Sequence, residues 1–259
     1  MTFVKAKKHL GQHFLKDENI AQKIVNSLSE DAFSKVLEIG PGMGVLTKYL
    51  FQKKNFETKI IDIDRESIAF LKNKFPDFKN NILEGDFLQQ DISGYFNEPF
   101  AIIGNFPYNI SSQILFKVLE NKNQVVEIVG MFQKEVAERI AAKTRTKAYG
   151  ILSVLVQAFF ETEYLFTVNE SVFAPPPKVK SAVIRLKRKQ KYQLDCDEKL
   201  FFDVVKTGFN QRRKMLRNGL SKFQFSEAQK AHPFFTKRAE ELTVDDFVEI
   251  TNWVSISKK

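Results

Sequence analysis

The sequence predicts an α/β protein with a Rossmann-like sheet, mostly parallel with one antiparallel strand, and a small C-terminal helical domain. Up to Leu186, short apolar runs alternate with stretches of helical spacing, which is typical of βαβ units. A glycine loop, 40–44, follows the first of these runs directly. A charged segment, 187–191, then leads into helical patterns only. We therefore predict one domain over residues 1–187 and a second over 188–259.

The individual elements follow from local spacing. The first helix is expected after Asp17, whose side chain can accept a hydrogen bond from free backbone N–H groups at the helix start. The last two strands are joined through a triple proline and are expected to form an antiparallel edge. Strands are predicted over 35–39, 58–63, 82–83, 100–103, 125–132, 159–168 and 181–186, and helices over 44–53, 66–75, 111–119, 134–142 and 149–157, with C-terminal helical segments broken at Gly219, Pro233 and Thr243.

The composition is that of a globular protein without a disulfide framework or a structural metal. The chain has 259 residues, of which 43% are hydrophobic and 27% charged. Cys196 is the single cysteine, and together with His9, His13 and His232 it gives no zinc spacing. No segment reads as a signal peptide or a membrane span, so we expect a cytoplasmic protein. The formal net charge of +9 favours a polyanionic partner such as nucleic acid.

The glycine loop predicts a nucleotide-sized ligand at the end of the first strand. Residues 36–39 run directly into Gly40-Pro41-Gly42-Met43-Gly44, and glycine lets the backbone turn tightly and lie against a ligand. The dinucleotide motif G-x-G-x-x-G needs its third glycine at position 45, which is Val45 here. The form G-x-G-x-G after the acidic Glu38 is similar to the S-adenosylmethionine loop of Rossmann-like methyltransferases.

Acidic residues follow the next two predicted strands. Asp62 and Asp64 end the second strand, where a carboxylate can accept hydrogen bonds from ribose hydroxyls. Asp86 ends the third strand, where it can meet an adenine amino group, and we count its neighbour Phe87 among the cofactor-binding residues. Each of these residues alone is also typical of a turn or a helix cap. Their order at one edge of the sheet favours a cofactor site.

Asn105-Phe106-Pro107-Tyr108 ends the fourth strand and is expected to face the same site. The exocyclic amine of adenine is a poor nucleophile, and acceptors aimed at its hydrogens favour the pyramidal, reactive form. We predict the Asn105 amide oxygen and the Phe106 carbonyl as those acceptors, held by Pro107, with Tyr108 stacking on the base. An alkylated amine loses its proton readily, so no strong general base is required. Phe173 is predicted as a second wall for the base.

Several motifs along nearly the whole chain resemble one family, the small-subunit ribosomal RNA adenine N6,N6-dimethyltransferases, whose loss confers kasugamycin resistance. The motifs are Leu10-Gly11-Gln12-His13-Phe14-Leu15, Glu38-Ile39-Gly40-Pro41-Gly42-Met43-Gly44, Gly104-Asn105-Phe106-Pro107-Tyr108-Asn109-Ile110, Gln133-Lys134-Glu135-Val136, Phe173-Ala174-Pro175-Pro176-Pro177-Lys178-Val179 and Phe209-Asn210-Gln211-Arg212-Arg213-Lys214.

This resemblance implies transfer of methyl groups from S-adenosylmethionine to N6 of two adjacent adenosines. The adenosines lie in the 3′-terminal hairpin of small-subunit (16S) rRNA, and the reaction takes place during subunit assembly. The chain departs from the usual family pattern at His13, Phe106 and Asp62, where the family often has Asn, Leu and Glu. Phe106 still offers its carbonyl and Asp62 is still a carboxylate. The resemblance carries cofactor contacts onto His13, Leu15, Gly40, Asp62, Asp86 and Asn105.

Two basic clusters are expected to contact RNA, and the protein is expected to be a monomer. In the first, which runs from 178 to 191 without an acidic residue, we assign RNA contact to Lys178 and Lys180. In the second, the RNA-binding residues are predicted to lie on a helix in the C-terminal domain. A solvated basic face would give the same pattern. The residues of the second cluster are Arg212, Arg213, Lys214 and Arg217.

Three other functions compete with this interpretation. Methylation of large-subunit rRNA, the macrolide-resistance type, uses related motifs, but the stretch 208–214 and the long C-terminal part look more like the small-subunit group. A DNA adenine methyltransferase normally carries a target-recognition domain, for which about 70 C-terminal residues are few. The alternative outside the enzymes is a non-catalytic ribosome-assembly factor, against which an intact Asn105 and Tyr108 argue.

Overall fold

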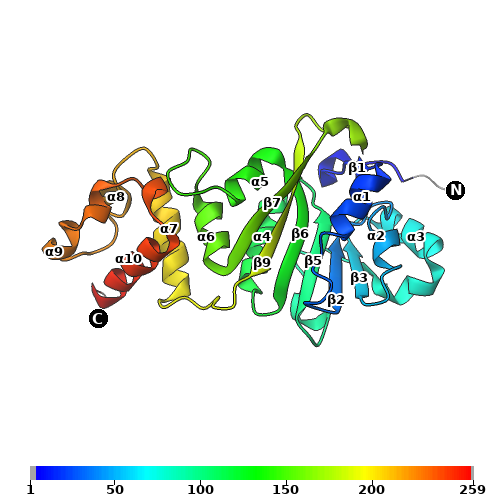
Figure 1. The fold of residues 1–259 in the computed structure, drawn as a ribbon, viewed down its shortest axis with the longest axis horizontal. Coiled ribbons are helices and arrows are strands. Elements are labelled where there is room, and N and C mark those ends of the chain that lie inside the picture. The colour runs from blue at the N-terminus through cyan, green and yellow to red at the C-terminus, as the bar shows by residue number, and fades with distance from the viewer. Residues whose placement is uncertain (1–3, 258–259) are drawn as a thin grey trace. The chain divides into compact units, whose positions relative to one another are not determined.

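The computed structural model describes residues 4–257 and divides the chain into two compact units (Figure 1). The first unit runs up to Ala137 and also contains Glu163–Arg188, whereas the second contains Glu138–Thr162 and the residues from Lys189 onward. The sequence analysis divides the chain at 187/188 and keeps 138–162 in the first domain. In the structure this segment joins the C-terminal unit. Its helix α6 (Ile151–Phe159) packs on α7 (Glu198–Asn210) and α10 (Val244–Ser257) of that unit.

The sheet has seven strands in the order β4-β3-β2-β5-β6-β9-β7. The strands from β2 to β6 pair in parallel, and β9 pairs antiparallel with β6. This arrangement confirms the predicted mostly parallel sheet with an antiparallel strand. The strands are β2 (Lys35–Ile39), β3 (Glu57–Asp62), β4 (Ile82–Glu84), β5 (Phe100–Asn105), β6 (Val125–Gln133), β7 (Phe160–Val168) and β9 (Ser181–Arg188).

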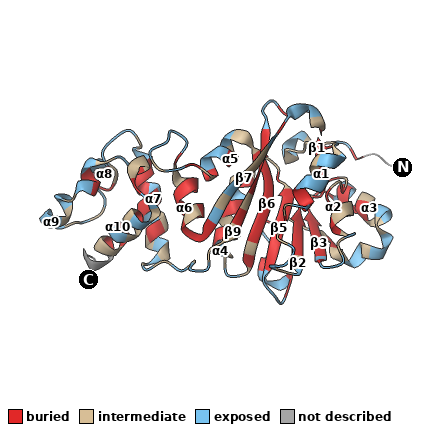
Figure 2. Cartoon of the chain, in the orientation of Figure 1, coloured by how far each residue is buried: buried red, intermediate tan, exposed pale blue. Residues whose placement is uncertain are grey.

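Burial explains why the central strands read as continuous apolar runs. β2, β5 and β6 are buried along nearly their whole length, on both faces of the sheet (Figure 2). The edge strand β7 is mostly half-exposed or exposed between its buried ends. The main core of the first unit combines these central strands with α1 (Glu18–Val25) and α2 (Thr47–Leu50).

Helices follow the strands of the first unit. α1 begins as predicted, since the Asp17 side chain accepts a hydrogen bond from the Ile20 backbone N–H at 3.0 Å. The predicted helix 44–53 is reduced to α2 because Gly44 has a φ of +77° and its N–H closes a turn onto the Pro41 carbonyl. The other helices along this part of the chain are α3 (Arg65–Lys74), α4 (Ser111–Glu120) and α5 (Lys134–Ile140), with short 3-10 turns η1 (Lys8–Leu10), η2 (Pro76–Asn81), η3 (Ile92–Gly94) and η4 (Glu170–Val172).

A second, two-stranded sheet joins distant parts of the first unit. β1 (Phe14–Leu15) pairs antiparallel with β8 (Phe173–Ala174), with Leu15 opposite Phe173. The N-terminal motif therefore lies beside the triple-proline loop. Strands of two residues carry no periodicity, which is why the sequence analysis does not predict this pairing.

The second unit is helical, as predicted. It contains α6 (Ile151–Phe159), α7 (Glu198–Asn210), α8 (Leu216–Gly219), α9 (Glu227–Lys230) and α10 (Val244–Ser257), with η5 (Pro233–Thr236) and η6 (Ala239–Glu241). The predicted breaks at Gly219, Pro233 and Thr243 coincide with element boundaries.

The prediction that the second basic cluster lies on one helix is wrong. α7 ends at Asn210, so Arg212, Arg213 and Lys214 lie in a turn, and Arg217 alone lies on α8. The chain turns there because Leu216 is buried against α7. A Cβ at Gly208 would lie 3.2 Å from the Leu216 side chain, which shows how closely the two approach.

Two observations over residues 4–257 concern membranes and metals. None of the helices there combines the length and the apolar character needed to cross a bilayer. No three His, Cys, Asp or Glu side chains of those residues gather in a way that would hold a metal ion.

Candidate active site at the carboxyl ends of the strands

A cavity lies where β2, β3 and β5 end, at one edge of the sheet. Its lining comes from the N-terminal residues 10–15, the glycine loop, the ends of the strands and residues 105–110. It brings together most of the residues predicted for cofactor binding and catalysis: His13, Leu15, Glu38, Gly40, Gly42, Asp62, Asp86, Asn105, Phe106, Pro107 and Tyr108. Gly44, Phe87 and Phe173 do not line it.

The three glycines of the loop serve different purposes. All have positive φ, at +67° for Gly40, +55° for Gly42 and +77° for Gly44, a region that favours glycine. A Cβ on Gly42 would lie 2.8 Å from the Phe14 ring, so this glycine makes room for the N-terminal segment. A Cβ on Gly44 would lie 2.7 Å from Leu71, so the third glycine lets α3 pack closely instead of facing the cavity.

Two buried carboxyl groups face the cavity without an ion pair. Asp62 accepts hydrogen bonds from the backbone N–H groups of Gly42 at 3.3 Å and Asp64 at 2.9 Å. Burial raises the pKa of Asp62 to about 6. Glu38 accepts a hydrogen bond from the Thr47 hydroxyl at 2.6 Å, and burial raises its pKa to about 8. Both groups retain acceptor capacity for hydroxyl or ammonium donors of a ligand.

The cavity lining also contains a carboxylate and an exposed apolar residue. Asp86 accepts a hydrogen bond from the Leu88 N–H at 2.9 Å through Oδ1, and it lines the cavity. Its neighbour Phe87 is buried and packs inward. Ile63 is 52% exposed and also lines the cavity. The sequence analysis missed Ile63, although an apolar residue between two acidic strand-end positions is the signal that an apolar ligand face lies there.

Asn105 is fixed in one orientation at the end of β5. Its Nδ2 donates a hydrogen bond to the His13 backbone carbonyl at 2.8 Å. A carbonyl oxygen only accepts, so the amide must turn its NH₂ towards His13. The Asn105 Oδ1 is then free to accept from a ligand, since no donor among residues 4–257 bonds it.

Phe106 is anchored by its side chain and offers its backbone. Its ring is buried and meets Phe132 edge-on, with ring centroids 5.1 Å apart, while its N–H donates to the Met131 carbonyl at 3.2 Å. A Cβ on Gly130 would lie 2.3 Å from this ring, so Gly130 provides the space for a phenylalanine here. Phe106 also lines the cavity, and its backbone is fixed by the bond to Met131 and by the buried ring.

Tyr108 is held by contacts on two sides. Its hydroxyl lies 2.5 Å from the Ser181 hydroxyl, and its ring stacks on His13 with centroids 5.4 Å apart. The His13 Nδ1 lies 2.8 Å from the Pro175 carbonyl oxygen. Burial raises the pKa of Tyr108, and the Ser181 hydrogen bond offsets part of the increase. The phenol therefore stays neutral near pH 7.

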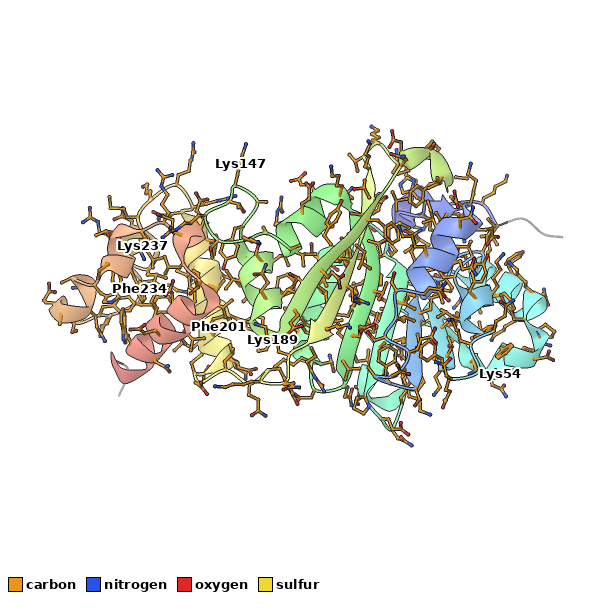
Figure 3. All side chains as sticks on the ribbon, in the orientation of Figure 1. Lys54, Lys147, Lys189, Phe201, Phe234 and Lys237 are labelled. Atoms are coloured by element: carbon orange, nitrogen blue, oxygen red, sulfur yellow. The ribbon has the colours of Figure 1, made fainter. Side chains whose placement is uncertain are left out.

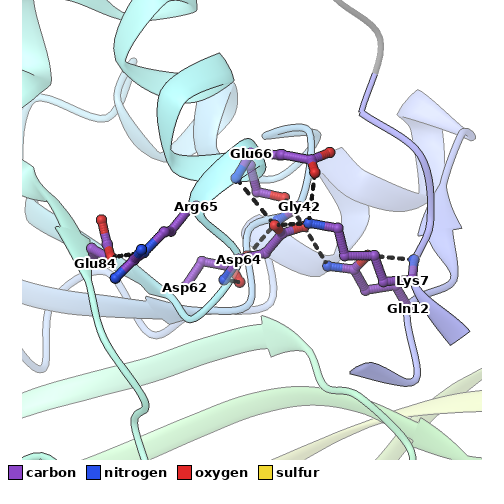
Figure 4. A network of polar contacts seen from close by, with 9 residues as sticks. Lys7, Gln12, Gly42, Asp62, Asp64, Arg65, Glu66 and Glu84 are labelled. Atoms are coloured by element: carbon purple, nitrogen blue, oxygen red, sulfur yellow. Dashed lines mark hydrogen bonds and ion pairs between the residues drawn. The ribbon is translucent and has the colours of Figure 1, made fainter. Parts of the chain in front are cut away.

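Residues 7–13, which we call the N-terminal strap, are fastened by Asp64 (Figure 4). Lys7 Nζ lies 2.5 Å from an Asp64 carboxylate oxygen, and Gln12 Nε2 donates to the other at 3.1 Å. Burial alone would raise the pKa of Asp64, but the hydrogen bonds from Lys7 and Gln12 bring it below its usual range. The sequence analysis takes Asp64 as a ribose acceptor. It instead holds the strap, and it does not line the cavity.

Phe173 lies in the core in this structure. Its side chain is 1% exposed, belongs to the main core cluster and sits opposite Leu15 in the small sheet. To stack on a base, its ring would have to leave this core. Lys178 and Lys180 are exposed on the loop that leads into β9, three residues and one residue before Ser181, respectively.

Four of the predicted RNA-binding residues belong to the second unit, and they differ in exposure and in their ion pairs. Arg213, Lys214 and Arg217 are exposed. Arg212 forms an ion pair with Glu240, its Nε 2.8 Å from the carboxylate.

Comparison with known proteins gives one consistent result. The profile of the family described as ribosomal RNA adenine dimethylase matches residues 3–255. Proteins named "Ribosomal RNA small subunit methyltransferase A" from Cytophaga hutchinsonii and Flavobacterium johnsoniae are 59% and 58% identical, covering 98% and 97% of this chain and 99% and 96% of their own.

Solved structures of two RNA-related transferases have a similar fold, and one of them acts on large-subunit rRNA. A dimethyladenosine transferase from Plasmodium falciparum superposes with a TM-score of 0.75 at 28% identity, covering 92% of this chain and 96% of that one. A 23S rRNA methyltransferase, ErmE, superposes with a TM-score of 0.68 at 26% identity, covering 92% and 99%.

Proposed function

The chain belongs to the ribosomal RNA adenine dimethylase family, and from this premise we propose how its own residues carry out the reaction. It is an S-adenosylmethionine-dependent methyltransferase that dimethylates adenine in small-subunit rRNA. The finer proposal is that it modifies N6 of two adjacent adenosines in the 3′-terminal hairpin during subunit assembly, acting as a monomer in the cytoplasm. The orientation of the Asn105 amide carries the proposal for the site.

The cavity suits S-adenosylmethionine, which supplies a methyl group on a sulfonium centre. Asp62 offers buried carboxylate lone pairs to ribose hydroxyls, and Asp86 offers an acceptor to an adenine amino group. Ile63 provides the apolar face for a purine. Gly40 gives an unobstructed backbone, and Glu38 is a buried acceptor beside the loop. The proposed cofactor set is completed by His13, Leu15, Gly42, Gly44, Phe87 and Asn105, of which Gly44 and Phe87 act through packing.

The target amine is held by two acceptors that cannot rotate away. Asn105 Oδ1 is fixed because Nδ2 is engaged with the His13 carbonyl at 2.8 Å. The Phe106 carbonyl is fixed because the ring beneath it is buried. Two acceptors aimed at the amine hydrogens favour the pyramidal amine and stabilise the positive charge that develops as it attacks. Pro107 keeps the turn between Phe106 and Tyr108 stiff.

The target adenine rests against Tyr108, and the reaction needs no strong proton acceptor. A phenol is protonated near pH 7, and burial raises the pKa of Tyr108 further, so Tyr108 contributes an aromatic face and not proton abstraction. The alkylated amine is strongly acidic and releases its proton to water. Phe173 remains the proposed second wall, which requires that its ring leave the core beside Leu15 when RNA binds.

The RNA is held by exposed cations in both units. We propose phosphate contacts for Lys178 and Lys180 in the loop that leads into β9. In the second unit we propose them for Arg213, Lys214 and Arg217. We propose Arg212 with them; its side chain is 40% exposed and forms an ion pair with Glu240.

Labelled S-adenosylmethionine tests this function. Purified protein is incubated in parallel with small subunits from a strain lacking the modification, with large subunits and with DNA. We expect label on small-subunit rRNA only. Label on large-subunit rRNA or DNA would overturn the substrate, and cofactor binding without transfer to any nucleic acid would make the chain an assembly factor.

A further inference from the structure

Ser181, the first residue of β9, has no role in the function proposed above. Its side chain is fully buried, at 0% exposure. The residue lies opposite Gln133 in the antiparallel pairing of β9 with β6. Just beyond that pair, the Lys134 N–H donates to the Lys180 carbonyl at 2.9 Å. The backbone of Ser181 is therefore fixed on both sides, and a short serine side chain places its hydroxyl at a defined point.

That hydroxyl meets the hydroxyl of Tyr108, 2.5 Å away. A tyrosine ring is attached to the backbone only through Cβ, so it can turn about χ1 and χ2 unless its far end is held. The backbone end of Tyr108 is held as well, because Ser111 Oγ donates to the Tyr108 carbonyl at 3.3 Å. The ring is thus fixed at both ends, by Ser111 at the backbone and by Ser181 at the phenol.

One face of the Tyr108 ring is already in contact with the protein. The imidazole of His13 stacks on it, with ring centroids 5.4 Å apart and an angle of 27° between the planes. His13 Nδ1 lies 2.8 Å from the Pro175 carbonyl oxygen, which only accepts, so Nδ1 carries the hydrogen of this bond. Tyr108 also lines the cavity, so the opposite face of its ring is left for a target adenine.

We propose that Ser181 is a positioning residue for methyl transfer, because its hydrogen bond sets the plane of the Tyr108 ring and, through it, the plane of the target adenine. The inference rests on the proposed function, in which Tyr108 stacks on that adenine. Asn105 Oδ1 and the Phe106 carbonyl meet the amine hydrogens only when the base lies in one plane. A ring released from Ser181 would let the base tilt and turn the amine away from both acceptors.

Single-turnover methylation of unmethylated small subunits at saturating S-adenosylmethionine tests this role. Ser181→Ala and Tyr108→Phe remove the same hydrogen bond from opposite sides, and both keep the aromatic ring. The matched control is Ser153→Ala, at another fully buried serine, whose hydroxyl donates to the Arg139 carbonyl at 2.5 Å. Ser153 does not line the cavity; it lies on α6, which packs on α7, the helix that carries Phe201 in Figure 3.

We expect Ser181→Ala, Tyr108→Phe and the double variant to share a single loss of about 10–10²-fold in the rate at saturating subunits, because all three lack the same bond. The subunit concentration that gives half the maximal rate and the Kd for S-adenosylmethionine should change by no more than a few fold. The control should methylate at the wild-type rate, although its Tm should fall about as far as that of Ser181→Ala. A merely structural role of Ser181 would lower the Tm without the loss of rate.

Three results would overturn the positioning role while the proposed function stands. The first is a wild-type rate for Ser181→Ala, and the second is a loss that multiplies in the double variant, which would mean that Ser181 acts apart from Tyr108. The third is a rise in the Kd for S-adenosylmethionine as large as the loss of rate. If Ser181→Ala does not fold, Tyr108→Phe decides: the expected loss supports the role and a wild-type rate refutes it. Wild-type protein that leaves the subunits unmethylated would instead refute the proposed function.

Discussion

Replacing Asn105 by alanine tests the amine-binding arrangement most sharply. The substitution removes the proposed acceptor Oδ1 and the 2.8 Å hydrogen bond from Nδ2 to the His13 carbonyl. Loss of one polar group that meets charge developing in the transition state costs about 10²–10³-fold in kcat, or about 2.7–4 kcal/mol. The lost hydrogen bond costs about 1 kcal/mol of stability. The residues proposed to hold S-adenosylmethionine elsewhere in the cavity are untouched.

The assay is single-turnover methylation of unmethylated small subunits, with S-adenosylmethionine affinity measured by calorimetry. We expect Asn105→Ala to slow methyl transfer by about 10²–10³-fold and to change the cofactor Kd by no more than a few fold. Asn123→Ala, at an exposed position outside the cavity lining, serves as the matched control and should behave as wild type. Near-normal turnover by Asn105→Ala would refute the acceptor role, and an equal loss of cofactor affinity would leave Asn105 with its cofactor contact alone.

Three further predictions follow from the same geometry. Gly42→Ala should destabilise the protein by about 1–3 kcal/mol in urea unfolding, because its φ is +55° and the new Cβ would meet the Phe14 ring at 2.8 Å; unchanged stability would contradict the close approach. Asp64→Asn and Lys7→Met should each weaken S-adenosylmethionine binding with little change in kcat, and the double variant should be no worse than either, whereas additive losses would show that the two residues do not act as a pair. For Glu38, the folded-state pKa of about 8 lies above the usual pKa of 4.5, so the folded state holds its proton to higher pH and stability falls as pH rises between those values. We expect the free energy of unfolding of the cofactor-free wild type to be lower at pH 9 than at pH 6, and the difference to be smaller in Glu38→Gln. An equal difference in the two proteins would contradict the raised pKa of Glu38.

The sheet and its active edge could be predicted because their signals are local. The strands β2, β3, β4 and β5 are apolar runs that end at or next to a glycine or an acidic residue, and parallel strands bring their ends to one edge. That reasoning alone collects Gly40, Asp62, Asp86 and Asn105 at one cavity, and the structure agrees.

The parts that sequence reasoning missed depend on contacts between distant segments. The position of Asp64 at a strand end predicts a hydrogen-bond acceptor for the cofactor. In the structure, Lys7 and Gln12 of the N-terminal strap bind its carboxylate instead. Arg212 reads as a free cation, but Glu240 and the Lys147 carbonyl bind it. No local pattern encodes such pairs, because they form only when the chain folds.

Gly42 has a second role that sequence reasoning did not predict. Glycine was expected where the backbone approaches a ligand, and Gly42 does line the cavity. Its missing Cβ, however, makes room for the Phe14 ring of the neighbouring small sheet. A short strand of two residues leaves no periodic signal, so neither β1 nor this contact could be foreseen.

Mass spectrometry of the 3′-terminal rRNA fragment tests the central claim most directly. Small subunits from a strain lacking the modification are incubated with the protein and S-adenosylmethionine, and the fragment is then sequenced by mass. The account predicts N6,N6-dimethyladenosine at two adjacent positions of the terminal hairpin. Unmodified adenosines there, with methylation elsewhere or none, would contradict it.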